Sequence, residues 1–80
     1  MTAQEPEKIA IIAQQVRDYL STHPKAADTL QGITGWWLPQ QGVNVDSELV
    51  QKALDYLVAH DEVVCLRSAD GHMLYARGER

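Results

Sequence analysis

The side chains with the greatest capacity for chemistry are three histidines and one cysteine. His23, His60, His72 and Cys65 belong to residue types that bind transition metals. A structural zinc site normally takes its ligands from close pairs such as CxxC or HxxxH, and the chain contains neither spacing. His60 ends an expected helix, where a cation interacts favourably with the helix dipole. The sequence therefore predicts no metal site and no cofactor.

The carboxylates do not predict catalysis either. Asp46 with Glu48, and Asp61 with Glu62, are close in sequence, but the first pair matches a helix start and the second a solvated turn. Cys65 stands in an apolar segment, where cysteine usually behaves as a small hydrophobe. The sequence has no glycine-rich phosphate loop and no serine-nucleophile motif. We therefore expect a binding protein and not an enzyme.

Two adjacent tryptophans, Trp36 and Trp37, are the most conspicuous aromatic residues. Neighbouring residues of a helix point about 100° apart, so a small domain does not readily bury both rings. One tryptophan is expected to anchor the core. The other is either exposed, as tryptophans at protein interfaces are, or packed beneath a loop or the C-terminal hairpin. Of these two interpretations, packing is favoured.

The chain has 80 residues, of which 45% are hydrophobic, and this composition predicts one domain over residues 1–80. The ends, at about 1–5 and 78–80, are expected to fray. A single cysteine excludes an internal disulfide and fits a reducing compartment. The N-terminal residues are polar and acidic, unlike a signal peptide, and no apolar run approaches the ~20 residues of a membrane span. A cytoplasmic protein without membrane contact is expected.

Three segments show helical periodicity. Apolar residues recur at spacings of three and four over residues 6–22, 26–38 and 47–59, with Asp46 or Ser47 offering an N-cap oxygen to the last segment. Gly32 and Gly35 weaken the middle helix and leave a smooth strip where another helix can approach closely. Packing is therefore expected to hold the middle helix in place.

Two strands are expected after the helices. Residues 62–68 are rich in β-forming types, and residues 73–77 are expected to return antiparallel to them. Between them lies the pair Asp70-Gly71, a strong hairpin signal. The chain therefore ends in a β-hairpin.

Residues 49–77, LVQKALDYLVAHDEVVCLRSADGHMLYAR, resemble the third helix and wing of bacterial winged-helix regulators. The family pattern is matched by Val50, Ala53, Leu54, Leu57, Val63, Val64, Asp70, Gly71 and Tyr75. Asp61 stands near the usual helix-terminal glycine, and aspartate tolerates the left-handed conformation. The resemblance implies a mainly α fold with a C-terminal β-hairpin, a winged helix-turn-helix with a two-stranded wing. The segment GWWLP and the long loop after it depart from the commonest versions, and no particular family is assigned.

In DNA-binding winged helices the start of the third helix enters the major groove, and the wing contacts the backbone or minor groove. By position, the resemblance implies DNA binding by Asn44, Ser47, Gln51, Lys52, Arg67 and His72. Amide and hydroxyl groups can read base edges. A DNA-binding transcriptional regulator, with a homodimer that adds basic surface, is therefore the slightly favoured function.

Charge argues for an alternative. The formal net charge is −4, and residues 26–60 carry four carboxylates against one lysine. Phosphate contacts dominate the affinity for DNA and require lysine or arginine. The alternative is a winged helix that binds a partner protein through Trp36, Glu48 and Asp55, without DNA. A continuous acidic face over residues 44–55 would favour that alternative, and a positive patch of Arg17, Lys52, Arg67 and Arg77 would favour DNA.

Overall fold

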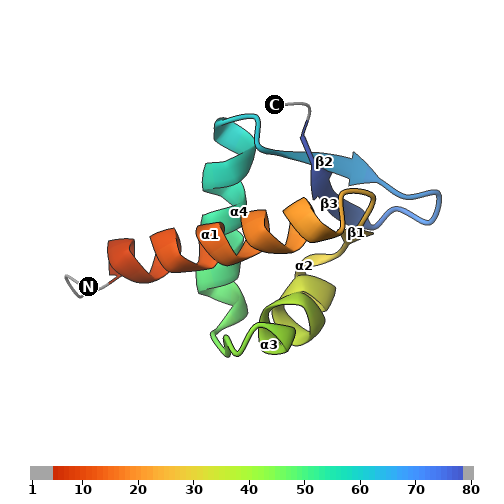
Figure 1. Ribbon diagram of the computed structural model, residues 1–80. Helices are drawn as coiled ribbons and strands as arrows, with labels where there is room; N and C mark the ends of the chain where they lie inside the picture. The colour runs from red at the N-terminus through yellow and green to blue at the C-terminus, as the bar shows by residue number, and fades with distance from the viewer. Residues whose placement is uncertain (1–4, 79–80) are drawn as a thin grey trace.

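The computed structural model describes residues 5–78, which form a mainly helical protein with a three-stranded antiparallel sheet. Three helical stretches precede a C-terminal hairpin, and α1 crosses α4 while the sheet lies to one side of both (Figure 1). The described elements are α1 (Glu5–Thr22), β1 (Ala27–Asp28), α2 (Leu30–Gly32), η1 (Ile33–Trp37), α3 (Leu38–Gln40), α4 (Ser47–Ala59), β2 (Val63–Arg67) and β3 (Met73–Arg77).

The helix α1 forms where the apolar periodicity predicts it. Its stripe is buried against α4, and the buried residues are Ile12, Ala13, Val16, Tyr19 and Leu20. The hydroxyl of Thr22 donates a hydrogen bond of 3.0 Å to the carbonyl of Tyr19, in the last turn before Pro24. Proline disfavours a helical conformation in the residue before it, so α1 ends here.

Fraying is predicted for residues 1–5 and 78–80, and of these the structure describes Glu5 and Gly78. Glu5 begins α1, and its carboxylate lies 2.8 Å from the ammonium of Lys52. Gly78 is buried, and its N–H donates a 2.9 Å hydrogen bond to the carbonyl of Glu62. Both residues are held by partners distant in the sequence, which local composition does not reveal. The rest of the prediction, for residues 1–4 and 79–80, lies outside the described residues.

The second helical stretch begins four residues later than expected. Ala27 and Asp28 form β1, and Thr29 then caps the helix by accepting a 3.1 Å hydrogen bond from the N–H of Gly32. In η1 the hydrogen bonds widen to the π pattern, and the N–H of Leu38 bonds to the carbonyl of Ile33. A π-turn inserts one extra residue into a helix. Trp37 and Leu38, although adjacent, are both buried.

The two tryptophans differ completely in burial. Trp37 is 2% exposed, and its ring stacks on Tyr19 with centroids 4.5 Å apart and planes 11° from parallel. Trp36 is 64% exposed, so the favoured expectation that the second ring packs beneath a loop or the hairpin is wrong. Trp37 takes the inward direction from η1, and the change of direction between neighbouring residues turns Trp36 toward solvent.

No helix packs closely against the strip formed by Gly32 and Gly35. A Cβ at Gly32 would overlap the carboxylate of Asp28, which also accepts a 2.7 Å hydrogen bond from the N–H of Thr29. A Cβ at Gly35 would meet nothing within 4 Å. The close approach at Gly32 is therefore made by a side chain from β1, and Gly35 faces open space.

The helix α4 supplies the centre of the core and agrees with its predicted range. Val50, Ala53, Leu54 and Leu57 are fully buried along one face. Asp46 occupies the N-cap position, but its side chain makes no capping hydrogen bond. At the other end, Asp61 has φ 60°, the left-handed conformation that aspartate tolerates better than most residues. This left-handed residue turns the chain from α4 into β2.

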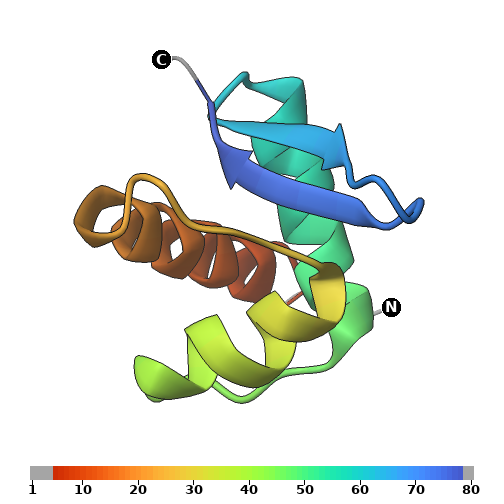
Figure 2. The ribbon, with the colours of Figure 1, turned by 90° about the vertical axis from the view of Figure 1, so that its right-hand side faces the viewer.

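The sheet has the order β1-β3-β2, and the expected hairpin pairs Cys65 with Tyr75 at its centre. Gly71 has φ 89° in the connecting turn, a conformation that favours glycine. The third strand, β1, adds Ala27 beside Ala76 along the outer edge of β3 (Figure 2). This strand was not expected, because two residues are too few to show an alternating pattern.

None of the helices within residues 5–78 is both long enough and apolar enough to cross a bilayer.

Candidate functional site

The residues implied for DNA binding lie on α4, on the loop before it and on the C-terminal hairpin. Ser47, Gln51 and Lys52 are on the first half of α4, and Asn44 lies in the loop before it. Arg67 ends β2, and His72 lies in the turn of the hairpin. Apart from Gln51, which is half-buried, all of these residues are exposed.

Gln51 serves to connect α4 to the sheet. Its amide nitrogen donates a 2.9 Å hydrogen bond to the carboxylate of Asp55 and a 3.1 Å hydrogen bond to the hydroxyl of Tyr75. The second bond joins α4 to β3 over 24 positions of sequence. Both donor hydrogens of the Gln51 amide are therefore engaged within the protein.

Lys52 forms an ion pair with a carboxylate of α1. Its ammonium lies 2.8 Å from the carboxylate of Glu5, and the hydrogen bond with Glu5 raises the pKa of Lys52 above 10.5, with a smaller contribution from Glu48. Exposed ion pairs of this kind add little stability. The ion pair instead changes the surface electrostatics, because the carboxylate of Glu5 offsets the positive charge that would attract a phosphate.

The exposed side of α4 is acidic. Glu48 and Asp55 lie seven positions apart, two helical turns along one face, and Asp46 lies just before the helix; all three are exposed. Within residues 5–78, no lysine or arginine forms an ion pair with any of the three. We call Asp46, Glu48 and Asp55 the acidic face of α4. Lys52 lies between Glu48 and Asp55 on the same exposed side of α4, and its charge is matched by Glu5.

The cations named for a positive patch do not converge. Arg17 is paired with Glu62, and Lys52 with Glu5. Arg67 lies opposite Met73 in the hairpin, whereas Arg77 lies opposite Val63 at the other end. Four residues of strand separate the two arginines by about 13 Å. The structure therefore does not gather the four cations into one patch.

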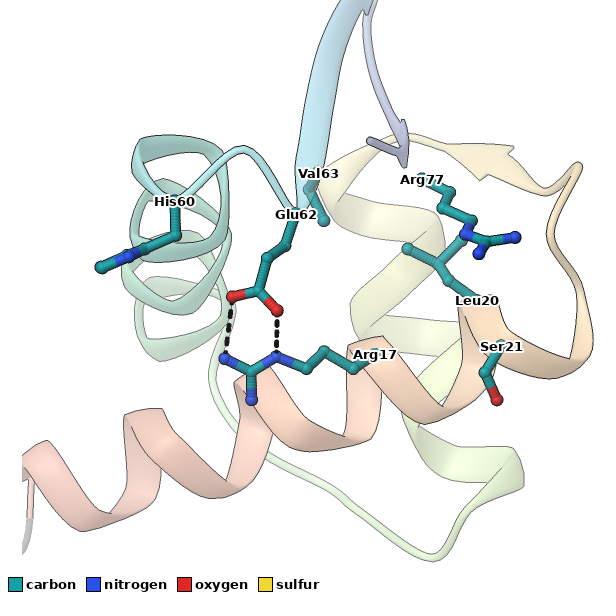
Figure 3. Close-up of a pocket in the computed structure, with 7 residues that line it drawn as sticks. All are labelled: Arg17, Leu20, Ser21, His60, Glu62, Val63 and Arg77. Carbon is teal, nitrogen blue, oxygen red and sulfur yellow. Dashed lines mark hydrogen bonds and ion pairs between the residues drawn. The ribbon is translucent and has the colours of Figure 1, made fainter. Parts of the chain in front are cut away.

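The pair formed by Arg17 and Glu62 borders a shallow recess of about 470 Å³ between α1, the end of α4 and the sheet (Figure 3). Two parallel hydrogen bonds, of 2.6 and 3.0 Å, join the guanidinium to the carboxylate. The hydrogen bond with Glu62 raises the pKa of Arg17 above its usual range, although partial burial opposes the shift. His60 points away from this pair and packs against Tyr56, with ring centroids 4.4 Å apart. This side-chain arrangement joins α1 to the start of β2 and provides no nucleophile with an adjacent base.

The possible metal ligands are dispersed. His23 stacks on Tyr19, and His72 lies 3.3 Å from the carboxylate of Asp70. Cys65 is half-buried in β2 and packs against the core. Across residues 5–78, no three side chains of the metal-binding types come together.

The hairpin turn is organised around Asp70. Its carboxylate accepts a hydrogen bond from the hydroxyl of Ser68, and the Ser68 oxygen accepts a 3.1 Å hydrogen bond from the N–H of His72. The bond from Ser68 is the largest of the causes that lower the pKa of Asp70 below 3.8. The turn therefore holds its aspartate in the charged form.

This arrangement predicts a pH effect. Because the pKa of Asp70 is lower in the folded state, its contribution to stability is present above pH 3.8 and is lost as pH falls through the folded value. An NMR titration of the Asp70 carboxyl carbon should give a midpoint below 3.8. In Ser68→Ala the midpoint should rise toward 3.8, since the main hydrogen bond is lost. Identical midpoints in the two proteins would contradict this assignment.

The sequence reasoning missed a partly exposed apolar surface on the hairpin. Val64 pairs with Ala76, and Leu66 with Leu74, on the side of the hairpin opposite to Val63, Cys65 and Tyr75. None of these four packs against the buried core, and Leu66 is 49% exposed. The signal was the period-two alternation, in which both faces of the expected strands are apolar.

Comparison of the sequence with known protein families finds no match, and comparison with curated proteins finds none either.

Proposed function

We propose that this protein is a winged-helix domain that binds a basic partner protein through the acidic face of α4. The element order supports the winged-helix assignment, because three helical stretches precede an antiparallel hairpin with a left-handed Asp61 between α4 and β2. The single observation that carries the function is the acidic face itself, Asp46, Glu48 and Asp55, beside a lysine already paired with Glu5.

Electrostatics explains the preference for a basic partner. Exposed carboxylates without a paired cation attract lysine and arginine and repel phosphates, and such complementarity mainly sets partner choice and association rate. The formal net charge of −4 acts in the same direction. A partner segment rich in lysine or arginine would therefore approach this face faster than DNA would.

DNA binding, which the family resemblance implies, stays a prediction. The observation in its favour is that Asn44, Ser47 and Lys52 are exposed around the start of α4. Under that function, Lys52→Glu should abolish binding and Asp46→Asn should strengthen it. No response to either substitution would remove α4 from a DNA interface.

One pair of titrations separates the two functions. The protein is titrated with a labelled lysine- and arginine-rich peptide, and separately with labelled random-sequence duplex DNA, at low and moderate salt. Amide chemical shifts are recorded in both. For the proposed function, the peptide should shift residues 46–55, and DNA should have little effect even at low salt, where non-specific binders respond.

Substitutions test whether the acidic face is the site. Glu48→Gln combined with Asp55→Asn should weaken peptide binding about 5- to 30-fold, since an exposed ionic contact contributes up to roughly 1 kcal/mol. Glu7→Gln combined with Asp18→Asn is the matched control, because both residues are exposed carboxylates of α1 and the same two charges are lost. Equal weakening by both variants would mean that net charge alone attracts the peptide. Salt-sensitive DNA shifts at residues 47–52 and in the hairpin would favour the DNA function instead.

A further inference from the structure

A groove lies between the first half of α1 and the segment that leads into α4. Its volume is about 630 Å³, within the range of protein ligand sites. The aliphatic residues that line it are Ile11 and Ile12 of α1, Val43 and Val45 of the loop, and Leu49 of α4. The groove is therefore mainly apolar and large enough to receive side chains of another molecule.

The aliphatic lining of this groove is incompletely buried. Ile11 is 56% exposed, whereas Ile12 beside it is buried in the core. Val43, Val45 and Leu49 pack against the core and yet are only partly buried. Removing such surface from water is favourable. A partner with aliphatic side chains would therefore gain affinity by placing them in the groove.

The charges at the rim of the groove indicate what kind of partner can lie there. Asp46 lines the groove and also belongs to the acidic face of α4, so the two surfaces are continuous. Its carboxylate makes no capping hydrogen bond, and within residues 5–78 it forms no ion pair. Glu48, two positions further on, is also exposed. A molecule that fills the groove therefore meets free carboxylates on the α4 side.

These carboxylates discriminate among possible occupants. They attract lysine and arginine, and they repel the phosphates of DNA and of anionic lipids. A second copy of this chain is disfavoured, because its formal net charge is also −4. The opposite wall of the groove carries the exposed cation Lys8. Basic residues of an occupant are therefore drawn toward α4 and kept away from α1.

We propose, on the basis of the function proposed above, that the basic partner is amphipathic and that its aliphatic side chains fill this groove. Its lysines and arginines then lie against Asp46 and Glu48, while Lys8 sets the orientation by repelling them from the other wall. Amphipathic segments commonly dock in apolar grooves in this way. The ionic contacts set partner choice and association rate, and burial of the aliphatic side chains supplies affinity.

Two labelled peptides with equal length and equal lysine and arginine content test this proposal on the full chain. One peptide carries leucine at every third or fourth position, and the other carries serine at the same positions. The leucine peptide should bind at least about tenfold more tightly, roughly the effect of burying one leucine side chain. In NMR spectra, the methyl groups of Ile11, Val45 and Leu49 should respond to the leucine peptide and much less to the serine peptide.

A substitution in the groove tests where the leucines lie. Ile11→Ser changes an exposed residue and leaves the buried Ile12 in place, so the fold is retained. It should abolish the tenfold preference for leucine and leave the affinity for the serine peptide unchanged. Leu66→Ser is the matched control, because Leu66 is 49% exposed on the hairpin and does not line the groove. This control should keep the preference.

The outcomes separate this proposal from the proposed function. Equal affinity for the two peptides, with both weakened by Glu48→Gln combined with Asp55→Asn, would overturn the amphipathic partner and leave the acidic face as the site. A preference for leucine that survives Ile11→Ser would also overturn it, and loss of the preference in Leu66→Ser would place the apolar contact on the hairpin. Leucine-peptide binding that needs Ile11 but ignores the acidic-face substitutions would refute the proposed function and retain the groove. Binding of neither peptide would refute both.

Discussion

Trp37→Ala is expected to leave the protein largely unfolded under mild denaturing conditions, whereas Trp36→Ala is expected to leave its stability almost unchanged. Truncating a buried tryptophan costs about 3–5 kcal/mol, because apolar burial is lost and a cavity remains. Trp37 is 2% exposed and also stacks on Tyr19, a contact that adds further stabilisation. The total stability of a chain of this length is about 4–12 kcal/mol.

The matched residue makes this comparison informative. Trp36 is the same residue type as Trp37 and adjacent to it, but its side chain is 64% exposed. Surface substitutions usually change the free energy of unfolding by less than about 0.5 kcal/mol. Urea unfolding followed by circular dichroism measures both variants. Equal midpoints for the two variants would mean that Trp37 does not anchor the core as the structure shows.

Gly78→Ala is expected to lower the free energy of unfolding by about 1–3 kcal/mol, the range for inserting atoms into closely packed structure. A Cβ at Gly78 would collide with the carbonyl oxygen of Asp61 and approach the backbone of Glu62. Backbone atoms cannot rotate away as a side chain can. Relief would require breaking the 2.9 Å hydrogen bond from the N–H of Gly78 to Glu62, which closes the hairpin beside the end of α4.

Gly35→Ala is the matched control and should have the opposite sign. Gly35 lies in a helical stretch, with open space where the methyl group would go, and alanine is favoured over glycine in helices by roughly 1 kcal/mol. Thermal unfolding should therefore show Gly78→Ala below the wild type and Gly35→Ala slightly above it. In a domain of this size, about 1 kcal/mol corresponds to a midpoint shift of about 4–8 °C. An unchanged midpoint for Gly78→Ala would show that the end of the hairpin moves freely.

Only part of the candidate site could be predicted from the sequence. Glu48 and Asp55 could be placed on the exposed side of α4 from the helical period alone, and the structure agrees. The partners of Lys52 and Gln51 could not be predicted, because Glu5 lies 47 positions from Lys52 and Tyr75 lies 24 positions from Gln51. These contacts pair the Lys52 ammonium with a carboxylate and occupy the Gln51 amide. They depend on how α1 and β3 pack against α4.

The sequence by itself determined the elements with strong local signals. Residue spacing and backbone preference, which act over a few neighbouring residues, predict the apolar stripes of α1 and α4 and the Asp-Gly turn of the hairpin. Tertiary structure alone decided the rest: the pairing of β1 with β3, the π-turn in η1 and the inward choice of Trp37 over Trp36. Each of these is weak or ambiguous locally, since β1 has two residues and adjacent tryptophans are chemically identical. Packing against Tyr19 and the sheet selects among the local alternatives, because burial of apolar surface outweighs the small differences between them.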